Sequence, residues 1–373
     1  MNIGFDAPDF FGYNGAASYS RSIIFTMAKY LPGHEVHVFV PGRQPKGFSS
    51  GMENIRIITP GIQTNKEPGP LWYAFQAGRK LKKHQIKIYH GLHNELPRIS
   101  SSYKDQLRLV LSVHHLTFLH HPDLFKQPEI EAYRESIRQN CSMADHIMVS
   151  EETTRTDLIN HFQIPANKIS MLTRPCDPFI QRTASEKEKK QIRDKYNLPD
   201  QYMLFAGKAE NQKNIFLLAQ AIEQTHKDIP LVILTSPTPY LRKLVKYLST
   251  HLLDEVYFLT HPNFHDLPAI YQSARLFVYP SYYSGYGTPI VEAAYSNIPV
   301  ITSEPDYSEK FSFERMFFIE PDNPTRLADK LNEVWDKKPD KKYPENTNQE
   351  KEQHKTNREI AEDLWQIYQK TIS

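Results

Sequence analysis

The last third of the sequence contains a short apolar run that is followed by two glycines and then by residues typical of a helix start. The run, Leu276–Tyr279, has the composition of a buried strand. Gly285 and Gly287 can take positive φ angles and let a ligand approach the backbone closely. Thr288 is predicted as a helix N-cap, with Pro289 at the first helical position. The N–H groups and dipole of such a helix start attract a phosphate, and the alternative is an ordinary strand–turn–helix connection.

Two lysines surround a second turn of the same kind. Gly207 and Lys208 follow the apolar run Tyr202–Ala206, and Lys213 comes five residues after Lys208. Two ammonium groups in one strand-to-helix turn can converge on a diphosphate as point charges. Glu292, one helical turn after the glycine loop, is positioned to reach a sugar hydroxyl beside that phosphate. The alternative for both lysines is that they are solvated loop residues.

The first half of the chain offers a helix start and a group of histidines. The segment Asn14–Arg21, with Gly15 near its beginning, opens the first long helical pattern. His114 and His115 follow the strand-like run Arg108–Val113, and four histidines occur within eight residues there. The sequence contains no H-E-x-x-H motif, no closely spaced cysteine pair and no D-x-D motif. We therefore expect no metal site.

Composition excludes several classes of function. The net charge of +2 gives no general nucleic-acid signal, and no apolar run approaches the length of a spanning helix. The cysteines, Cys141 and Cys176, are far apart and suggest a reducing compartment. We expect a cytoplasmic protein whose membrane contact, if any, is peripheral. Aromatic and basic residues in Leu71–Lys83 could touch an anionic leaflet, although a core-facing helix with a solvated basic end is the favoured interpretation.

The elements that must position these residues alternate between strand and helix patterns. A length of 373 residues favours two domains, and the alternation predicts an α/β fold with parallel sheets covered by helices on both faces. We expect one domain at residues 1–178, a second at 179–336 and a charged linker at 337–356, followed by an amphipathic helix at 357–373. The predicted strands are Glu35–Val40, Arg108–Val113, His146–Ser150, Tyr202–Ala206, Leu231–Leu234, Val256–Leu259 and Leu276–Tyr279.

In combination, these motifs resemble the retaining GT-B glycosyltransferases of family four. That family carries two glutamates, separated by seven residues, around a Gly-aromatic-Gly-x-Pro core. Here Gly285, Tyr286, Gly287, Thr288 and Pro289 match the core, Glu292 matches the second glutamate, and Ser284 replaces the first. The resemblance implies two doubly wound, Rossmann-like domains facing a central cleft, with the last helix returning to the first domain. It also implies metal-independent transfer with retention and no cofactor.

The resemblance assigns roles residue by residue. A nucleotide-diphosphate sugar would be the donor, and a glycan or lipid-linked molecule the acceptor. Lys208 and Lys213 would neutralise the departing diphosphate, Glu292 would bind the ribose, and His114 would face the transferred sugar. These four are the predicted catalytic residues. The predicted donor-binding residues are Gly15, Gly207, Ser284, Gly285, Tyr286, Gly287 and Thr288.

Three departures from the family pattern keep a second hypothesis open. Ser284 lacks a carboxylate, His115 stands at an aspartate position, and Ala17 stands at a glycine position where positive φ is expected. The first hypothesis is a glycosyltransferase of cell-surface polysaccharide or lipopolysaccharide biosynthesis. The alternative is a non-catalytic homologue that binds a nucleotide sugar, a glycan or a partner transferase. A GT-B epimerase or phosphorylase is a weaker alternative.

Overall fold

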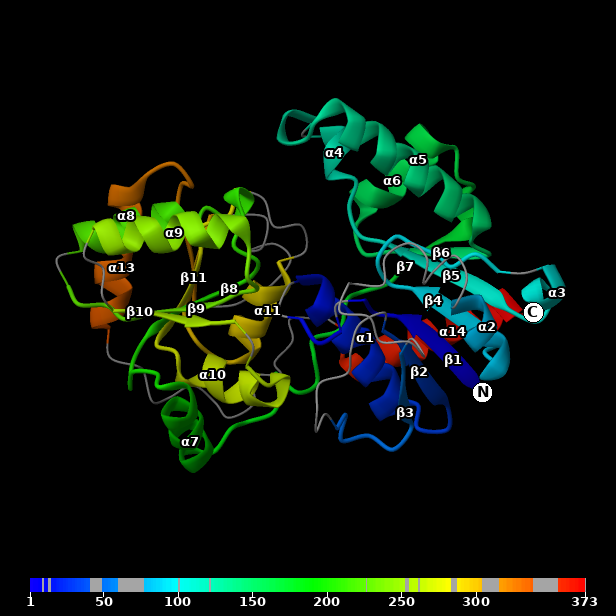
Figure 1. Cartoon of the computed structure of the whole chain (residues 1–373), viewed down its shortest axis with the longest axis horizontal. Helices are drawn as coiled ribbons and strands as arrows, with labels where there is room; N and C mark the ends of the chain where they lie inside the picture. Colours follow the sequence, from blue (N-terminus) through cyan, green and yellow to red (C-terminus); the bar gives the residue numbers. More distant parts are fainter. Residues whose placement is uncertain are drawn as a thin grey trace. The chain divides into compact units, whose positions relative to one another are not determined.

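The structure is a computed structural model of the chain, and it divides into two compact units. One unit comprises Met1–Phe11, Tyr19–Pro175 and Lys355–Ser373, and the other comprises Gly12–Ser18 and Cys176–His354 (Figure 1). The residues described are 1–8, 10–12, 15–40, 49–59, 77–99, 101–120, 122–225, 227–251, 255–260, 262–282, 287–303, 315–337 and 355–372.

The first unit is built on a seven-stranded sheet in which every strand pair is parallel. The strands lie in the order β3-β2-β1-β4-β5-β6-β7, so the winding reverses direction between β1 and β4. Their bounds are β1 (Asn2–Asp6), β2 (Glu35–Phe39), β3 (Ile55–Ile58), β4 (Ile88–Gly91), β5 (Arg108–Val113), β6 (His146–Val149) and β7 (Ile169–Met171).

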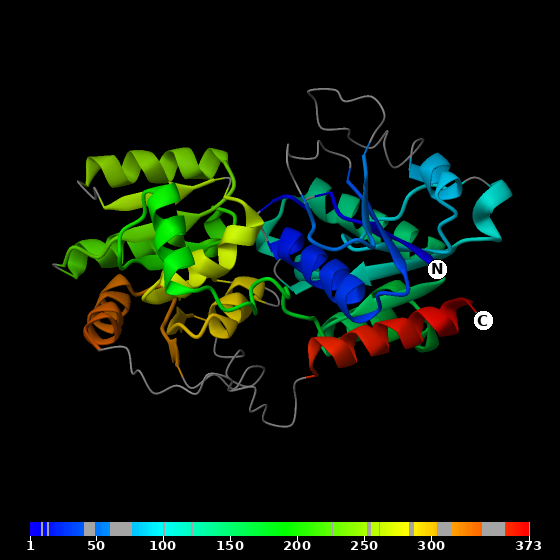
Figure 2. The same ribbon diagram turned by 90° about the horizontal axis from the view of Figure 1, so that it is seen from below.

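Helices cover both faces of this sheet because its side chains alternate between two cores. On one face Leu109, Leu111 and Val113 pack with residues of α2, α5 and α6. On the other face His90 hydrogen-bonds Ser112 through one ring nitrogen and Tyr368 of α14 through the other. Figure 2 shows α14 beside α1. The bounds are α1 (Gly15–Tyr30), α2 (Ala77–Lys83), α3 (Ser101–Lys104), α4 (Thr117–His120), η2 (Pro122–Leu124), α5 (Gln127–Met143), α6 (Glu152–Phe162), η3 (Ala166–Lys168) and α14 (Asn357–Ile372).

The second unit repeats the plan with a six-stranded parallel sheet in the order β10-β9-β8-β11-β12-β13. Its winding reverses between β8 and β11. The strands are β8 (Met203–Ala206), β9 (Leu231–Leu234), β10 (Val256–Leu259), β11 (Leu276–Tyr279), β12 (Val300–Thr302) and β13 (Met316–Phe318). The helices are α7 (Glu186–Tyr196), η4 (Asn211–Lys213), α8 (Ile215–Gln224), α9 (Pro239–Thr250), η5 (Phe264–Asp266), α10 (Leu267–Ser273), α11 (Thr288–Tyr295) and α13 (Pro324–Asp336).

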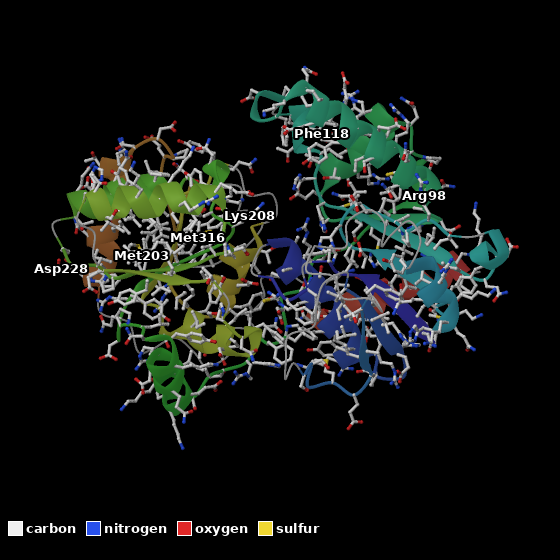
Figure 3. All side chains as sticks on the ribbon, in the orientation of Figure 1. Arg98, Phe118, Met203, Lys208, Asp228 and Met316 are labelled. Atoms are coloured by element: carbon white, nitrogen blue, oxygen red, sulfur yellow. The ribbon has the colours of Figure 1, made fainter. Side chains whose placement is uncertain are left out.

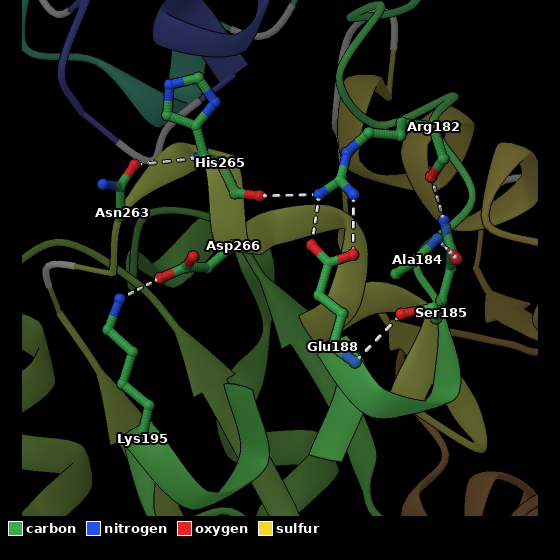
Figure 4. Close-up of polar contacts among 9 residues, drawn as sticks. Arg182, Ala184, Ser185, Glu188, Lys195, Asn263, His265 and Asp266 are labelled. Atoms are coloured by element: carbon green, nitrogen blue, oxygen red, sulfur yellow. Dashed lines mark hydrogen bonds and ion pairs between the residues drawn. The ribbon is translucent and has the colours of Figure 1, made fainter. Parts of the chain in front are cut away.

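Polar contacts fasten α7 to the rest of the second unit (Figure 4). The Ser185 hydroxyl caps α7 by accepting the Glu188 N–H at 3.2 Å, a contact of a kind that contributes about 1 kcal/mol. Arg182 forms a two-pronged ion pair with Glu188 at 2.8 and 2.6 Å and also donates to the His265 carbonyl. At the other end, Lys195 pairs with Asp266 at 2.5 Å. These contacts therefore hold α7 against η5 and α10.

The predicted α/β class with doubly wound parallel sheets is confirmed. The observed units differ from the predicted domain ranges at residues 12–18, which group with the second unit, and at 176–178. Most of the predicted linker 337–356 lies outside the described residues, so the predicted domain boundaries stay predictions. Among the described helices, none is long and apolar enough to cross a membrane.

Candidate functional site

The carboxyl ends of β8 and β11 meet where the second sheet reverses its winding. Met203 and Leu204 of β8 pair with Leu276 and Phe277 of β11. Ligands of open α/β sheets bind in the crevice beyond the strand ends at such a reversal. Gly207, the first residue after β8, has φ of +147°, which residues with a side chain rarely adopt. Glycine therefore lets the chain leave the sheet at this point.

Both predicted lysines belong to the connection that leaves β8. The Lys213 ammonium lies 5.5 Å from the ring centroid of Tyr279, the last residue of β11. Lys208, labelled in Figure 3, forms an ion pair with Glu210, and its side chain is about half exposed (49%). Lys213 is therefore held over the end of β11, whereas the charge of Lys208 is partly balanced by its neighbour.

Backbone and side-chain hydrogen bonds tie this lysine connection to the segment after β11. The Gln212 carbonyl accepts the Tyr282 N–H at 2.9 Å and the Ser281 hydroxyl at 3.0 Å. Asn214 takes a left-handed conformation before α8 and donates to the Pro321 carbonyl at 2.7 Å. These contacts fix the backbone on both sides of Lys213 at the sheet edge.

The predicted glycine loop leads into α11, one residue later than the sequence suggested. Gly287, with φ of +68°, is the N-cap, and Thr288 is the first helical residue. The prediction of Thr288 as N-cap was wrong, because the left-handed turn into the helix occurs at the glycine, which tolerates it. Ser284, Gly285 and Tyr286 lie outside the described residues. The N-terminus of α11 thus follows β11 at the same edge as Lys213.

Glu292 lies inside the second unit rather than on its surface. Its side chain is buried, and one carboxylate oxygen accepts the Tyr271 hydroxyl at 2.7 Å. The other oxygen accepts the hydroxyl of Ser18, which groups with the same unit. The carboxylate thereby joins α10, α11 and the beginning of α1. A contact between Glu292 and a ribose stays a prediction.

His114 follows β5 at the carboxyl edge of the first sheet and is held by the backbone. Its Nε2–H donates to the Leu92 carbonyl at 2.6 Å, so the proton is on Nε2. Its ring also packs edge-on against Tyr19, with centroids 4.4 Å apart. Burial, followed by the positive charges of Arg174 and His93, lowers the pKa of His114 well below its usual value. The imidazole is therefore neutral at pH 7.

Sequence reasoning missed the residues that surround His114. The Arg174 guanidinium lies 5.0 Å from the Tyr19 ring centroid, and the Tyr19 hydroxyl hydrogen-bonds Ser112 at 2.9 Å. The Ser20 hydroxyl forms a hydrogen bond with Nε2 of His93 at 3.1 Å. A signal was available for His93, which follows a strand, and for Ser20, which stands in the first helix. Arg174 gave no signal because it lies in a short Pro-containing connector.

One expectation about the start of α1 is corrected, and the donor-binding role of Gly15 stays a prediction. Ala17 is a buried helical residue without positive φ, so the predicted strain of alanine at this position is absent. Gly15 is the first residue of α1, and a methyl group added to it would meet open space among the described residues. His115, the other departure, is exposed, and its Nδ1 hydrogen-bonds the Thr117 hydroxyl at 2.8 Å.

Within the described ranges, His, Cys, Asp and Glu do not gather in groups of three or more that could hold a metal ion. Among the histidines near the carboxyl edge of the first sheet, His120 pairs with Asp157 at 2.6 Å. The expectation of metal-independent chemistry stays a prediction.

Sequence comparisons find relatives among bacterial O-antigen enzymes. O-antigen chain mannosyltransferase B of Escherichia coli is 29% identical over 231 residues, which are 60% of this chain and 58% of that protein. O-antigen chain mannosyltransferase RfbU of Salmonella typhimurium is 24% identical over 274 residues, which are 72% of this chain and 71% of that protein. The match with the first relative therefore spans less than two thirds of its length.

Solved structures share the fold. Sucrose-phosphate synthase from Thermosynechococcus elongatus superposes with a TM-score of 0.69 at 17% identity, over 99% of this chain and 98% of that chain. WaaG, a glycosyltransferase involved in lipopolysaccharide biosynthesis, superposes with a TM-score of 0.65 at 17% identity, over 89% and 90%. Residues 13–178 match the sequence model of Glycosyltransferase Family 4, and residues 186–354 match that of Glycosyl transferases group 1. The chain belongs to the group 1 glycosyltransferases with the GT-B fold.

Proposed function

We propose that the protein transfers a sugar from a nucleotide-diphosphate donor to a glycan or lipid-linked acceptor in cell-surface polysaccharide or lipopolysaccharide biosynthesis. The observation that carries the proposal is the carboxyl edge of the second sheet. There Gly207, Lys213 and the N-terminus of α11 come from the two strands that flank the reversal of winding. Mannose is the first sugar to test, because the two relatives described above are O-antigen mannosyltransferases.

The chemistry of this edge suits a departing diphosphate. Negative charge grows on the leaving group as the bond to the anomeric carbon breaks. In the proposed mechanism the Lys213 ammonium and the N–H groups of the first turn of α11 stabilise that charge without reorganisation. Lys208 contributes less because Glu210 already pairs with it. Glu292 anchors α11 by accepting the hydroxyl of Tyr271. To bind the ribose as proposed, its carboxylate would exchange the hydroxyl of Tyr271 or Ser18 for a ribose hydroxyl.

The first unit supplies the proposed sugar-facing residue, His114. With Nε2–H donated to Leu92, the remaining ring nitrogen, Nδ1, can only accept a hydrogen bond. A neutral imidazole of this kind can orient a sugar hydroxyl without adding positive charge beside a developing oxocarbenium ion. Retention of anomeric configuration follows the family and is part of the proposal. Cytoplasmic location and peripheral membrane contact stay predictions.

A panel of nucleotide sugars tests the proposal in two steps. Thermal unfolding with UDP-, GDP- and ADP-sugars identifies the donor, since a ligand at 100 times its Kd adds about 2.7 kcal/mol to the stability of the folded state. Transfer is then measured with the selected donor and a lipid-linked glycan acceptor, with the corresponding nucleoside as the control ligand. Binding followed by product formation supports a transferase. Binding without product across the acceptor set supports the non-catalytic alternative, for which Ser284 is the reason.

A further inference from the structure

A hollow of about 440 Å³ opens on the first unit away from the proposed transfer site. It lies toward the amino-terminal ends of the strands, whereas His114 lies beyond their carboxyl ends. His37 of β2 and Arg56 of β3 line it as side-by-side partners in the parallel register. Lys83, the last residue of α2, and the adjacent His84 complete the basic part of its wall.

His37 is the unusual member of this wall. Its side chain is only 4% exposed, and among the described residues no group hydrogen-bonds either of its ring nitrogens. An imidazole always carries at least one N–H donor, and a buried polar group without a partner destabilises the fold. Buried polar atoms of this kind require an explanation, such as an ion, ordered water or a functional role. Its ring lies 5.3 Å, centroid to centroid, from that of His84, which shares the hollow.

The hollow also carries more positive than negative groups. Its acidic lining residue is Glu35, whose carboxylate already accepts from Nε of Arg56 at 2.7 Å. Arg56 is exposed, and its guanidinium has further N–H groups on the other two nitrogens. Lys83 adds an exposed ammonium. Hydrogen-bond donors therefore surround the hollow, and its acidic residue, Glu35, is already paired with Arg56.

The pKa values of both histidines respond to this charge. Burial, together with the positive charges of Lys83, Lys80 and Arg56, lowers the pKa of His84. Burial, His84 and Arg56 lower the pKa of His37 to about 4, although Glu35 acts in the opposite direction. A bound anion would oppose these effects, so the two imidazoles should report on it.

We propose that this hollow binds a phosphate-class anion, either free phosphate or the phosphate group of a lipid. Arg56 and Lys83 supply its charge-assisted hydrogen bonds, and the imidazoles of His84 and His37 supply further N–H donors. The ring nitrogens of His37 lie below the surface, so the proposal requires the neighbouring His84 ring to turn before the anion can reach them. Sulfate and phosphate share this recognition chemistry, whereas chloride offers one acceptor atom and no fork for the guanidinium.

Imidazole NMR on the full chain with inorganic phosphate is the direct test. At constant ionic strength, phosphate should shift the His37 and His84 resonances saturably and raise both pKa values, and chloride should not. Arg56→Gln and Lys83→Gln should each weaken phosphate binding by at least about tenfold, which corresponds to about 1.4 kcal/mol. Lys246→Gln, which removes an exposed charge from α9 in the other unit, should have no effect. A linear response shared by phosphate and chloride would overturn the proposal.

Vesicles separate the two sources of phosphate. Phosphatidylcholine vesicles with and without phosphatidic acid are compared by co-sedimentation, for the wild type and for Arg56→Gln. Binding that requires phosphatidic acid and is abolished in Arg56→Gln assigns a lipid phosphate, whereas a response to phosphate alone assigns a free anion. Vesicle binding that Arg56→Gln leaves intact, without His37 shifts, means that surface lysines act alone and contradicts the proposal. Donor binding in the other unit is measured in parallel, so failure here is distinguishable from failure of the proposed transferase function.

Discussion

Replacing Lys213 by methionine should weaken binding of a nucleoside diphosphate far more than it weakens the fold. Methionine keeps an unbranched side chain near the Tyr279 ring but removes the ammonium that lies 5.5 Å from the ring centroid. The cation–π interaction with this ring, which the free protein makes and the variant cannot, is worth about 0.5–1 kcal/mol. A charge-assisted hydrogen bond to phosphate is worth about 1.5–3 kcal/mol, which corresponds to about 10- to 150-fold in Kd.

Two further lysine variants make the Lys213 result specific. Lys243→Met removes one positive charge from an exposed position of α9 in the same unit, and it should leave the Kd unchanged. Lys208→Met should have a smaller effect than Lys213→Met, because Glu210 already pairs with Lys208. Isothermal titration calorimetry with the nucleoside diphosphate gives the three Kd values, and thermal unfolding checks each fold. Equal affinity of Lys213→Met and Lys243→Met would refute the assignment of Lys213 to the diphosphate.

Three other predictions concern the fold that holds the site. Gly207→Ala should destabilise the protein by about 1–3 kcal/mol in urea unfolding, because φ is +147° there, whereas Gly15→Ala at the open start of α1 should be neutral or slightly stabilising; equal effects would contradict the strain argument. Tyr271→Phe should cost about 1–3 kcal/mol by removing a donor from buried Glu292, and a circular-dichroism denaturation curve unchanged from wild type would contradict this. His90 is buried and its pKa is lowered from 6.5 to about 3, chiefly by burial. The unfolded chain therefore binds the proton first, so the free energy of unfolding should fall as the pH drops from 6.5 toward 3, by up to about 4 kcal/mol from this residue. In His90→Gln that part of the acid dependence should disappear, and an unchanged pH slope would contradict it.

Local sequence was enough to locate several strands of the second sheet. Leu231–Leu234, Val256–Leu259 and Leu276–Tyr279 were predicted with the bounds that the structure gives them. Each is a short run of apolar residues, several of them β-branched or aromatic, that packs on both faces of a parallel sheet. The end of β11 and the beginning of α11 were therefore readable from residue types alone, apart from the one-residue error at Thr288.

Contacts between residues far apart in the sequence were not readable. Glu292 accepts from Ser18, and His90 hydrogen-bonds Tyr368 at 2.7 Å, although each pair is separated by more than 270 residues. No periodicity or motif encodes such a pair, because it depends on how helices pack after the sheets form. The error at Ala17 has a different origin, because the family pattern suggested positive φ there and the chain instead continues as a helix.

The location of the diphosphate is the central claim, and a crystal structure with a bound nucleoside diphosphate tests it most directly. We predict the two phosphates at the carboxyl edge of the second sheet, with Lys213 and the N–H groups of Gly287 and Thr288 within hydrogen-bonding distance and the backbone of Gly207 alongside. A nucleotide bound elsewhere on this unit, with Lys213 still over the Tyr279 ring and no phosphate near α11, would contradict it.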